Sequence, residues 1–453
     1  MIDFSLKEIC EATGGKLYNA KEDLFIKGIT TDSRKAEEGV VFVALRGENF
    51  DGHSFAVKAC EDGALCVVSE EDFETIPYIK VKDTRRCLME IARAVRIKSG
   101  IKVVGITGSV GKTTTKDMVS SVLSEGFSVH KTNGNFNNDI GLPLTVFDIE
   151  NTHDMAVLEM GMNQFGEISR LSYGGMPDVA VITNVGVSHI ENLGSREGIL
   201  KAKSEIFDFM DENAYAVLNA DDDMLITLKG KRKNIIWYGI DNREDIYADN
   251  IVSLGLEGEM CDIHTMDWTI TVKIPIPGRH MVLNAMAAAG VGVAMGLSTE
   301  QIKTGIETFS ATKMRMDIST TEKGVKIIND AYNANPVSMK AALDVLKNCE
   351  GRRIAVIGDM FELGDFAQGM HYDVGSYAVD CGIDSLIFIG EASAAMKKAA
   401  DDKGFKNYCY YPSQEEFLNE DINGMFDKGD TVLVKASRGM QLEKTVRKIQ
   451  EVK

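Results

Sequence analysis

Residues 103–114 read VVGITGSVGKTT, and this stretch decides the fold because an apolar strand runs into a glycine-rich turn that opens a helix. Glycines let backbone N–H groups converge on phosphate oxygens, while Lys112 supplies a mobile cation and Thr113 a hydroxyl for Mg²⁺. Apolar residues continue at helical spacing across 112–125, so the positive end of a helix faces the turn. The stretch predicts a site for a nucleoside triphosphate, ATP in the first place.

The turn departs from the strict P-loop pattern of Gly, four residues and Gly-Lys-Ser/Thr. That pattern needs glycine at position 106, where this chain has Ile106 between Gly105 and Gly108. A glycine turn between a strand and a helix can be purely structural, but Gly-Lys-Thr in this context favours phosphate binding. We interpret the turn as a variant P-loop.

Composition narrows the class of protein. A chain of 453 residues is too long for one core, and we expect three domains. A net charge of −18 and the lack of a long Lys/Arg run argue against nucleic acid as a partner, because a phosphate backbone needs a basic face. Any anionic ligand must then be held by a local cationic cluster or by metal.

Eight scattered cysteines, with no C-x-x-C pair, indicate reduced thiols of a cytoplasmic protein. The stretch 1–15 lacks the basic start and apolar run of a signal peptide. The apolar stretch 281–297 is short for a membrane span and contains Asn284, so we expect a buried helix and no membrane insertion.

Strands and helices alternate along the chain, which predicts an α/β protein of three domains. We expect a small N-terminal α/β domain over 1–82 and a central P-loop ATPase-type domain with a mostly parallel sheet over 83–310. A Rossmann-like C-terminal domain follows over 311–453, and 245–275 is interpreted as a β-rich insertion or edge. No G-x-G-x-x-G follows a strand of the third domain, which argues against a nicotinamide site.

Several side chains beyond the turn could carry chemistry. Glu159 ends an apolar strand where P-loop enzymes place an acidic Mg²⁺ ligand, although a strand-end glutamate can simply be solvated. His189 follows the next strand, a position that is more often structural than ligating. Lys201 and Lys203 begin a helix and would ordinarily form a solvated face. The amide-rich stretch 330–336, DAYNANP, can form turns or bind ligand hydroxyls.

The motifs, taken in order, resemble the Mur ligase family over essentially the whole chain. They are TTDSR, NFDGHSF, TGSVGKTTTKDM, GNFNNDIGLPLT, LEMGMNQFGEI, TNVGVSHIENLGSREGILKAKSEIF, PGRHMVLNAMAA, MRMD, DAYNANPVSMKAAL and GDMFELG. Within that family they look most like the member that joins D-alanyl-D-alanine to UDP-N-acetylmuramoyl-tripeptide. The resemblance implies a monomeric, ADP-forming ligase of peptidoglycan precursor synthesis that works through an acyl phosphate.

The resemblance also implies roles for individual residues at the nucleotide. Lys112 and the backbone of Gly108, Ser109, Val110, Gly111, Thr113 and Thr114 would hold the ATP phosphates. Thr113 and Glu159 would bind one Mg²⁺, and His189 would serve a second. Lys203 would be carbamylated by CO₂ and so become an anionic metal ligand, since an ammonium is repelled by Mg²⁺. Asn284 and Asp330 would approach adenine and ribose, and Arg315 the γ-phosphate.

For the other substrates the implied assignments are coarser. Ser33 and Arg34 match the part that would bind the uridine diphosphate end, and Asn137 and Asn138 lie in a motif near nucleotide and acceptor. Asn333, Asn335 and the stretch 435–438 would lie near D-alanyl-D-alanine. Met281 stands where many family members have asparagine. The sequence does not identify the base that deprotonates the amine; His189 and the carboxylates are candidates.

Three alternatives stay open. A family member that adds a single amino acid would share the ATP and metal residues, but the Asp-Asn-Pro-Arg motif expected of the diaminopimelate-adding enzyme is absent from the sequence. A folylpolyglutamate synthase-like ligase resembles less of the N-terminal region. A nucleotide switch that binds ATP without ligation would share the fold alone.

Overall fold

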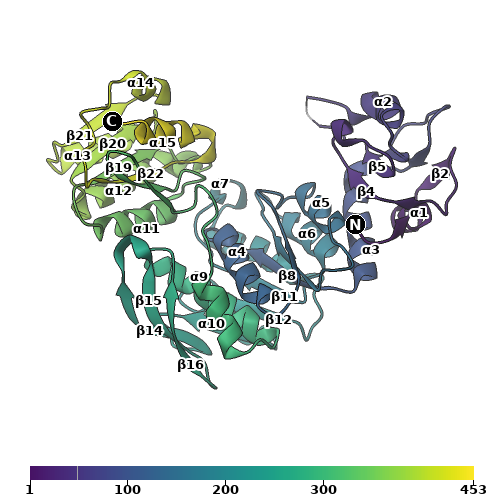
Figure 1. Cartoon of the computed structure of the whole chain (residues 1–453), viewed down its shortest axis with the longest axis horizontal. Coiled ribbons are helices and arrows are strands. Elements are labelled where there is room, and N and C mark those ends of the chain that lie inside the picture. The colour runs from purple at the N-terminus through teal and green to yellow at the C-terminus, as the bar shows by residue number, and fades with distance from the viewer. Residues whose placement is uncertain (48, 453) are drawn as a thin grey trace.

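The computed structural model describes residues 1–47 and 49–452, which form three α/β units along the chain (Figure 1). The first unit is built on a five-stranded sheet of order β2-β7-β6-β5-β4, in which only β2 runs antiparallel to its neighbour. Helix α1 begins at a capping box formed by Ser5 and Glu8. The elements are β1 (Phe4–Ser5), α1 (Leu6–Thr13), β2 (Lys16–Tyr18), β3 (Phe25–Ile26), β4 (Gly28–Thr30), η1 (Ser33–Lys35), β5 (Val40–Val43), η2 (Gly52–Phe55), α2 (Ala56–Glu61), β6 (Cys66–Ser69) and β7 (Tyr78–Lys80).

The central unit carries a nine-stranded sheet of order β16-β15-β14-β13-β12-β11-β8-β10-β9, parallel from β9 to β14. Strands β15 and β16 add an antiparallel edge. The elements are α3 (Thr84–Ser99), β8 (Lys102–Thr107), α4 (Lys112–Ser124), β9 (Val129–Lys131), α5 (Gly141–Phe147), β10 (Met155–Glu159), α6 (Glu167–Gly175), β11 (Val179–Ile182), α7 (Ile190–Leu193), α8 (Arg196–Ser204), η3 (Glu205–Phe207), β12 (Tyr215–Asn219), η4 (Leu225–Leu228), β13 (Ile235–Gly239), β14 (Ile246–Ser253), η5 (Gly255–Glu257), β15 (Glu259–His264), β16 (Thr269–Ile274), α9 (Arg279–Ala294) and α10 (Thr299–Glu307).

The third unit has a six-stranded sheet of order β17-β18-β22-β19-β20-β21, parallel except for β17. Its elements are β17 (Asp317–Thr320), β18 (Lys326–Asn329), α11 (Pro336–Lys347), β19 (Arg353–Gly358), η6 (Gly364–Phe366), α12 (Ala367–Asp380), β20 (Ser385–Ile389), α13 (Ala394–Asp402), β21 (Tyr408–Tyr411), α14 (Gln414–Asn419), β22 (Thr431–Lys435), η7 (Arg438–Met440) and α15 (Glu443–Gln450). The two edge strands β17 and β21 did not follow from the sequence, because their residues are largely half-buried or exposed and lack an apolar run.

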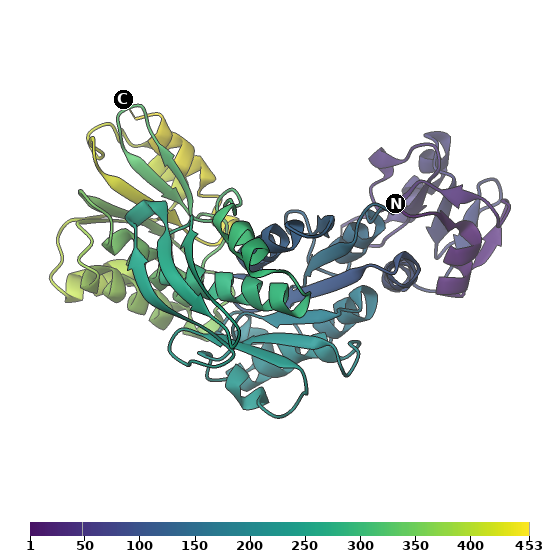
Figure 2. The same cartoon turned by 60° about the horizontal axis from the view of Figure 1, so that its bottom comes forward.

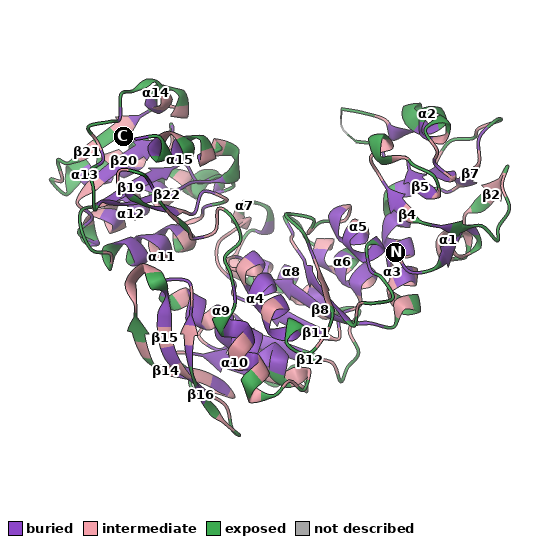
Figure 3. Ribbon diagram, in the orientation of Figure 1, coloured by how far each residue is buried: buried purple, intermediate pink, exposed green. Residues whose placement is uncertain are grey.

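The α/β class, with a mostly parallel central sheet, is confirmed; the limits of the three domains stay predictions. The parallel strands of the central sheet are buried on both faces, as a sheet covered by helices requires (Figure 3). Helix α9 is buried over most of its length, as expected for the apolar stretch around Asn284. Across the described chain, no helix is both long and apolar enough to span a membrane.

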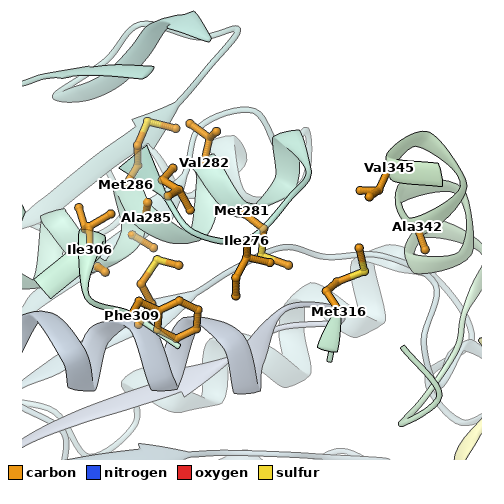
Figure 4. Packing of buried hydrophobic residues seen from close by; sticks show 14 of the residues in the cluster. Ile276, Met281, Val282, Ala285, Met286, Ile306, Phe309, Met316, Ala342 and Val345 are labelled. Carbon is orange, nitrogen blue, oxygen red and sulfur yellow. The ribbon is translucent and has the colours of Figure 1, made fainter. Parts of the chain in front are cut away.

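The central and third units share one apolar contact. Figure 4 shows Ile276, in the segment just before α9, and Met281, in the first turn of α9, on one side, with Met316, Ala342 and Val345 on the other. All five are nearly inaccessible to water. Figures 1 and 2 place β14–β16 on the side of the central sheet nearer the third unit, and the N-terminal unit at the opposite end. The third unit is therefore packed against the central one.

Gly108 is the position where the turn after β8 tolerates no side chain. Its φ is +156°, and a Cβ there would lie 1.9 Å from the Thr183 hydroxyl oxygen, which itself donates a hydrogen bond to the Val110 carbonyl oxygen. We expect Gly108→Ala to lower the free energy of unfolding by about 1–3 kcal/mol, because Thr183 must move. Thermal unfolding checks this. Gly369→Ala in α12 is the control, since nothing lies near its Cβ and alanine favours a helix; equal melting temperatures for the two variants would contradict the account.

Candidate functional site

A cavity of about 700 Å³ lies between the central and third units. It opens at the carboxyl ends of the central parallel strands, where α/β sheets bind ligands. Most residues singled out from the sequence line it: Ser109, Val110, Gly111, Lys112, Thr113, Thr114, Asn137, Asn138, Glu159, His189, Asn284, Arg315, Asp330, Asn333 and Asn335. The structure thus brings side chains from many segments of two units to one space.

The phosphate turn runs from Gly108 to Gly111, and α4 starts directly after it at Lys112. Gly111 caps the helix with a φ of +84°, a conformation that favours glycine. Ile106, which replaces the first glycine of the strict pattern, is a fully buried residue of β8 and pairs with Glu159 and Val181. The departure from the strict pattern therefore lies within the strand, and the turn itself keeps its glycines.

The segment after β11 braces this turn. The Asn184 side chain accepts a hydrogen bond from the Val110 N–H at 2.9 Å and donates one to the Val110 carbonyl oxygen at 3.0 Å. The Ser109 hydroxyl accepts from the Gly186 N–H at 2.9 Å. These hydrogen bonds from the neighbouring segment hold the turn in shape without a ligand.

Lys112 folds back over the turn, with its ammonium 2.7 Å from the Gly108 carbonyl oxygen. Burial lowers the pKa of this ammonium, and the negative charges of Glu159 and Glu362 oppose that lowering. A cation in this position is poised for anionic oxygens at the mouth of the turn.

Glu159 and Thr113 fit a divalent cation. The Glu159 carboxylate ends β10 and is buried; its Oε1 accepts a hydrogen bond from Asn137 at 2.9 Å, whereas its Oε2 is buried with no hydrogen-bond partner in the described structure. A buried carboxylate oxygen without a partner is costly unless something else binds it. Carboxylate and hydroxyl oxygens are the ligands that Mg²⁺ prefers.

His189 lies across the cavity mouth from the third unit. Its Nδ1 is 2.9 Å from the Glu362 Oε2, and both residues have a left-handed backbone, with φ of +63° and +62°. The close approach of the His189 ring lowers the pKa of the Glu362 carboxyl group, although the contact does not meet the geometry of a hydrogen bond. Non-glycine residues in this conformation are strained, and the surrounding structure must hold them there. The fold therefore fixes the positions of both residues of the pair.

Lys203 is 1 % exposed on α8, and its ammonium has no ion-pair or hydrogen-bond partner among the described residues. Burial lowers its pKa well below the ordinary value, and nearby Lys112 adds to the effect. The expectation of a solvated lysine face is therefore wrong at Lys203, although Lys201 is exposed. Burial disfavours the charged ammonium, so this side chain favours the neutral amine.

The third unit supplies cations to the cavity. The Arg315 guanidinium stacks 4.1 Å from the Tyr332 ring centroid and donates a hydrogen bond to the Thr113 hydroxyl at 3.2 Å. Lys435 is buried and lies 2.5 Å from the Asp330 Oδ2. Arg315 therefore reaches the phosphate turn from the other unit, whereas the Asp330 charge is met by Lys435.

The amides in the cavity divide into two groups. Asn138 accepts hydrogen bonds from the backbone at the start of α5, and Asn335 caps α11 while donating to the Ser188 hydroxyl across the units at 3.0 Å. Asn284 accepts from the Thr115 hydroxyl at 3.1 Å, beside the buried Met281. Asn137, as described, donates to Glu159. Asn138 and Asn335 are thus engaged at the starts of helices. Asn284 is bound to α4, and Asn137 to the candidate metal ligand Glu159.

Ser33 and Arg34 lie apart from this cavity, in η1 of the N-terminal unit. Arg34 pairs with Asp32 at 2.8 Å and its side chain is exposed. Gly108 and Lys203 also do not line the cavity. Binding of Ser33 and Arg34 to a distant part of a long substrate stays a prediction.

Sequence reasoning missed three residues that the cavity contains: Asn184, Asp222 and Glu362. Asp222 accepts hydrogen bonds from three backbone N–H groups after β11 and β12. All three residues follow the carboxyl ends of parallel strands, and that position was the signal which could have found them.

A glycine turn at the head of a parallel sheet, faced by cations from a second α/β unit, defines a multidomain protein of the P-loop nucleotide-binding class. Three family models match the chain: Mur ligase family, catalytic domain, over 25–96; Mur ligase middle domain over 106–292; and Mur ligase, glutamate ligase domain, over 314–438. The chain belongs to the Mur ligase family, and the resemblance drawn from the motifs is confirmed.

Curated relatives and solved structures agree with this assignment. The UDP-N-acetylmuramoyl-tripeptide–D-alanyl-D-alanine ligase of Bacillus subtilis is 40% identical, over 100% of this chain and 99% of the relative. The ligase of the same name from Escherichia coli is 36% identical over the same shares. MurF from Acinetobacter baumannii superposes with a TM-score of 0.92 at 33% identity and 99% coverage of both chains. The MurF ligase of Thermotoga maritima, solved in complex with ADP, gives 0.85 at 29% identity, over 95% of this chain and 99% of that one.

The unpartnered oxygen of Glu159 gives a testable consequence. We expect Glu159→Gln to weaken Mg²⁺-dependent binding of a non-hydrolysable ATP analogue by at least about tenfold, because one charged ligand is lost. Calorimetric titration with and without Mg²⁺ measures this. Glu197→Gln, on the exposed first turn of α8, is the control; the same Mg²⁺ response in both variants would rule out Glu159 as a ligand.

Proposed function

We propose that this chain is the ATP-dependent, ADP-forming ligase that joins D-alanyl-D-alanine to UDP-N-acetylmuramoyl-tripeptide. The observation that carries the proposal is the reach of Arg315 from the third unit to Thr113 on the phosphate turn, at 3.2 Å. This contact sets cations of two units around one place where a phosphoryl group can sit. The names of the relatives supply the substrates.

The reaction needs a concentration of positive charge because a carboxylate must approach a triphosphate. Lys112 contacts the turn at Gly108, Arg315 contacts Thr113 directly after it, and both cations oppose that repulsion in a chain whose net charge is −18. Magnesium bound by Thr113 and Glu159, with a second ion served by His189, would neutralise further phosphate charge. Local cations therefore overcome an unfavourable overall charge.

Two steps account for the product. A carboxylate oxygen of the tripeptide attacks the γ-phosphorus, the bond from that phosphorus to the β,γ-bridging oxygen breaks, and ADP leaves. The amine nitrogen of the dipeptide then attacks the acyl carbon, loses a proton, and inorganic phosphate departs as the amide bond forms. Closure of the third unit over the cavity would exclude water, which would otherwise hydrolyse the acyl phosphate.

We propose that Lys203 is carbamylated. Burial and the nearby Lys112 charge favour the neutral amine, which is the form that reacts with CO₂, and they outweigh the opposing charge of Asp222. The product is an anion beside the cation site, and it removes the cost of an unpaired ammonium there.

The remaining assignments complete the proposal. Asn284 and Asp330 would contact adenine and ribose, and Ser33 and Arg34 the uridine diphosphate end. Asn137, Asn138, Asn333 and Asn335 would lie along the path of the peptide substrates. Asn138 and Asn335 also cap helices, so their contribution to binding comes through the backbone that they hold.

Phosphate release tests the function directly. Turnover should require both UDP-N-acetylmuramoyl-tripeptide and D-alanyl-D-alanine, and Lys112→Ala should lower it by at least about a hundredfold, as for loss of one preorganised charge. Lys201→Ala, an exposed lysine, should retain activity. Turnover with single amino acids or folate substrates would indicate another ligase, and ATP hydrolysis without either peptide would indicate a nucleotide switch.

Lys203→Ala should be inactive, with partial recovery on addition of a small carboxylate that replaces the carbamate. Intact wild-type protein should also show CO₂-dependent activity and the added mass of carbon dioxide on Lys203, with Lys201 unmodified. Full activity after rigorous removal of CO₂ would contradict carbamylation.

A further inference from the structure

Glu362 stands apart from the other carboxylates that line the cavity. Asp139 pairs with Arg85, Asp330 pairs with Lys435, and the carboxylates of Glu167 and Asp222 accept hydrogen bonds from backbone N–H groups. Glu159 faces the turn as the candidate metal ligand. The one ion pair that Glu362 forms within the described structure is with the His189 ring, and its side chain is 57% exposed. The oxygens of this carboxylate can therefore accept further hydrogen bonds, and a cationic donor is the partner that suits their charge.

The loop that carries Glu362 is fixed on both sides. The Met360 N–H donates to His371 Nε2 at 2.9 Å, and the Phe361 N–H donates to the Ser437 hydroxyl at 2.9 Å. His371 is fully buried and its Nδ1 lies 2.7 Å from the Ala367 carbonyl oxygen. These contacts hold the left-handed backbone at Glu362, which would otherwise relax. A strained, anchored loop presents this carboxylate to the cavity.

Glu362 also lies near the reacting end of the cavity. Its charge acts on the Lys112 ammonium, and it comes from the third unit, on the opposite side from the phosphate turn. An amine held here is close to the place where an acyl phosphate would form. At neutral pH an α-amino group is mainly an ammonium, since its pKa is about 8.

We propose that the Glu362 carboxylate binds the ammonium of the incoming dipeptide and sets its nitrogen on the side of the acyl group facing the third unit. An ammonium offers three donors and a full charge, and it is a stronger partner for the carboxylate than the single ring nitrogen of His189. This inference rests on the proposed ligase function and names the acceptor contact that the sequence left open. It assigns Glu362 to recognition of the amine, and His371 and Ser437 to positioning the loop.

Glu362→Gln tests the inference because it removes the charge and keeps the shape. At saturating ATP and UDP-tripeptide, KM for D-alanyl-D-alanine should rise by about tenfold or more, as for a lost hydrogen bond to a charged group. The Kd for the ATP analogue, measured without dipeptide, should stay near the wild-type value. Glu362→Asp keeps the charge and should recover part of the affinity. Asp365→Asn, an exposed acid of the same loop outside the cavity, is the matched control.

An N-acetylated dipeptide, which has no ammonium, supplies a second readout. It should inhibit wild type and Glu362→Gln with equal affinity, whereas the free dipeptide should lose affinity only in the variant. An unchanged KM for the free dipeptide, or an equal loss with the N-acetylated one, would overturn the inference. Thermal unfolding of each variant shows whether it folds as the wild type does. If Glu362→Gln is destabilised, the KM of Glu362→Asp for the dipeptide tests the inference instead. Failure of the wild-type protein to ligate the dipeptide at all would instead overturn the proposed function.

Discussion

Three neighbouring strands, β8, β10 and β11, end side by side, and the whole site depends on this register. Ile106 pairs with Glu159 in one direction and Val181 in the other, so the strand that leads into the phosphate turn is flanked by the acidic strand end and by the bracing segment. A slip of one residue would turn every side chain of the slipped strand to the opposite face of the sheet. The buried apolar pattern on both faces of these strands prevents such a slip, and so core packing sets the chemistry.

Charge is organised locally in this protein. The chain is acidic overall, yet Lys112, Arg315 and Lys435 gather at one cavity. A backbone carbonyl oxygen, a hydroxyl and a carboxylate, respectively, orient them. Their partial burial strengthens attraction to phosphate, because fewer water molecules screen the charges. The unpartnered oxygen of Glu159, on β10, and the amine of Lys203, on α8, belong to the same central unit. Both are unfavourable in isolation, which is expected where a protein is built to hold ions.

Local sequence patterns predicted the strand, turn and helix around Lys112, and the position of Glu159, because both follow from the period of apolar residues and from glycine chemistry. They could not predict that Lys203 is buried while Lys201 is exposed, since that depends on what packs against α8. Glu362 and Asp222 both follow strand ends, but their contacts with His189 and with the Val185 N–H join segments far apart in the sequence, which local patterns do not bring together. The family resemblance predicted a role for Lys203 that stays a prediction, and it did not single out Glu362.

The two faces of the contact between the central and third units differ in kind. One edge is apolar, around Met281, Met316 and Val345, while the cavity edge is joined by polar contacts such as Asn335 to Ser188 and Arg315 to Thr113. Apolar side chains can slide past one another with little loss, whereas each polar contact contributes only about 1 kcal/mol and can be exchanged for water. The polar contacts can therefore be exchanged for water while the apolar edge stays buried, so the cavity edge is the side of this interface at which the two units can part to admit or release a ligand.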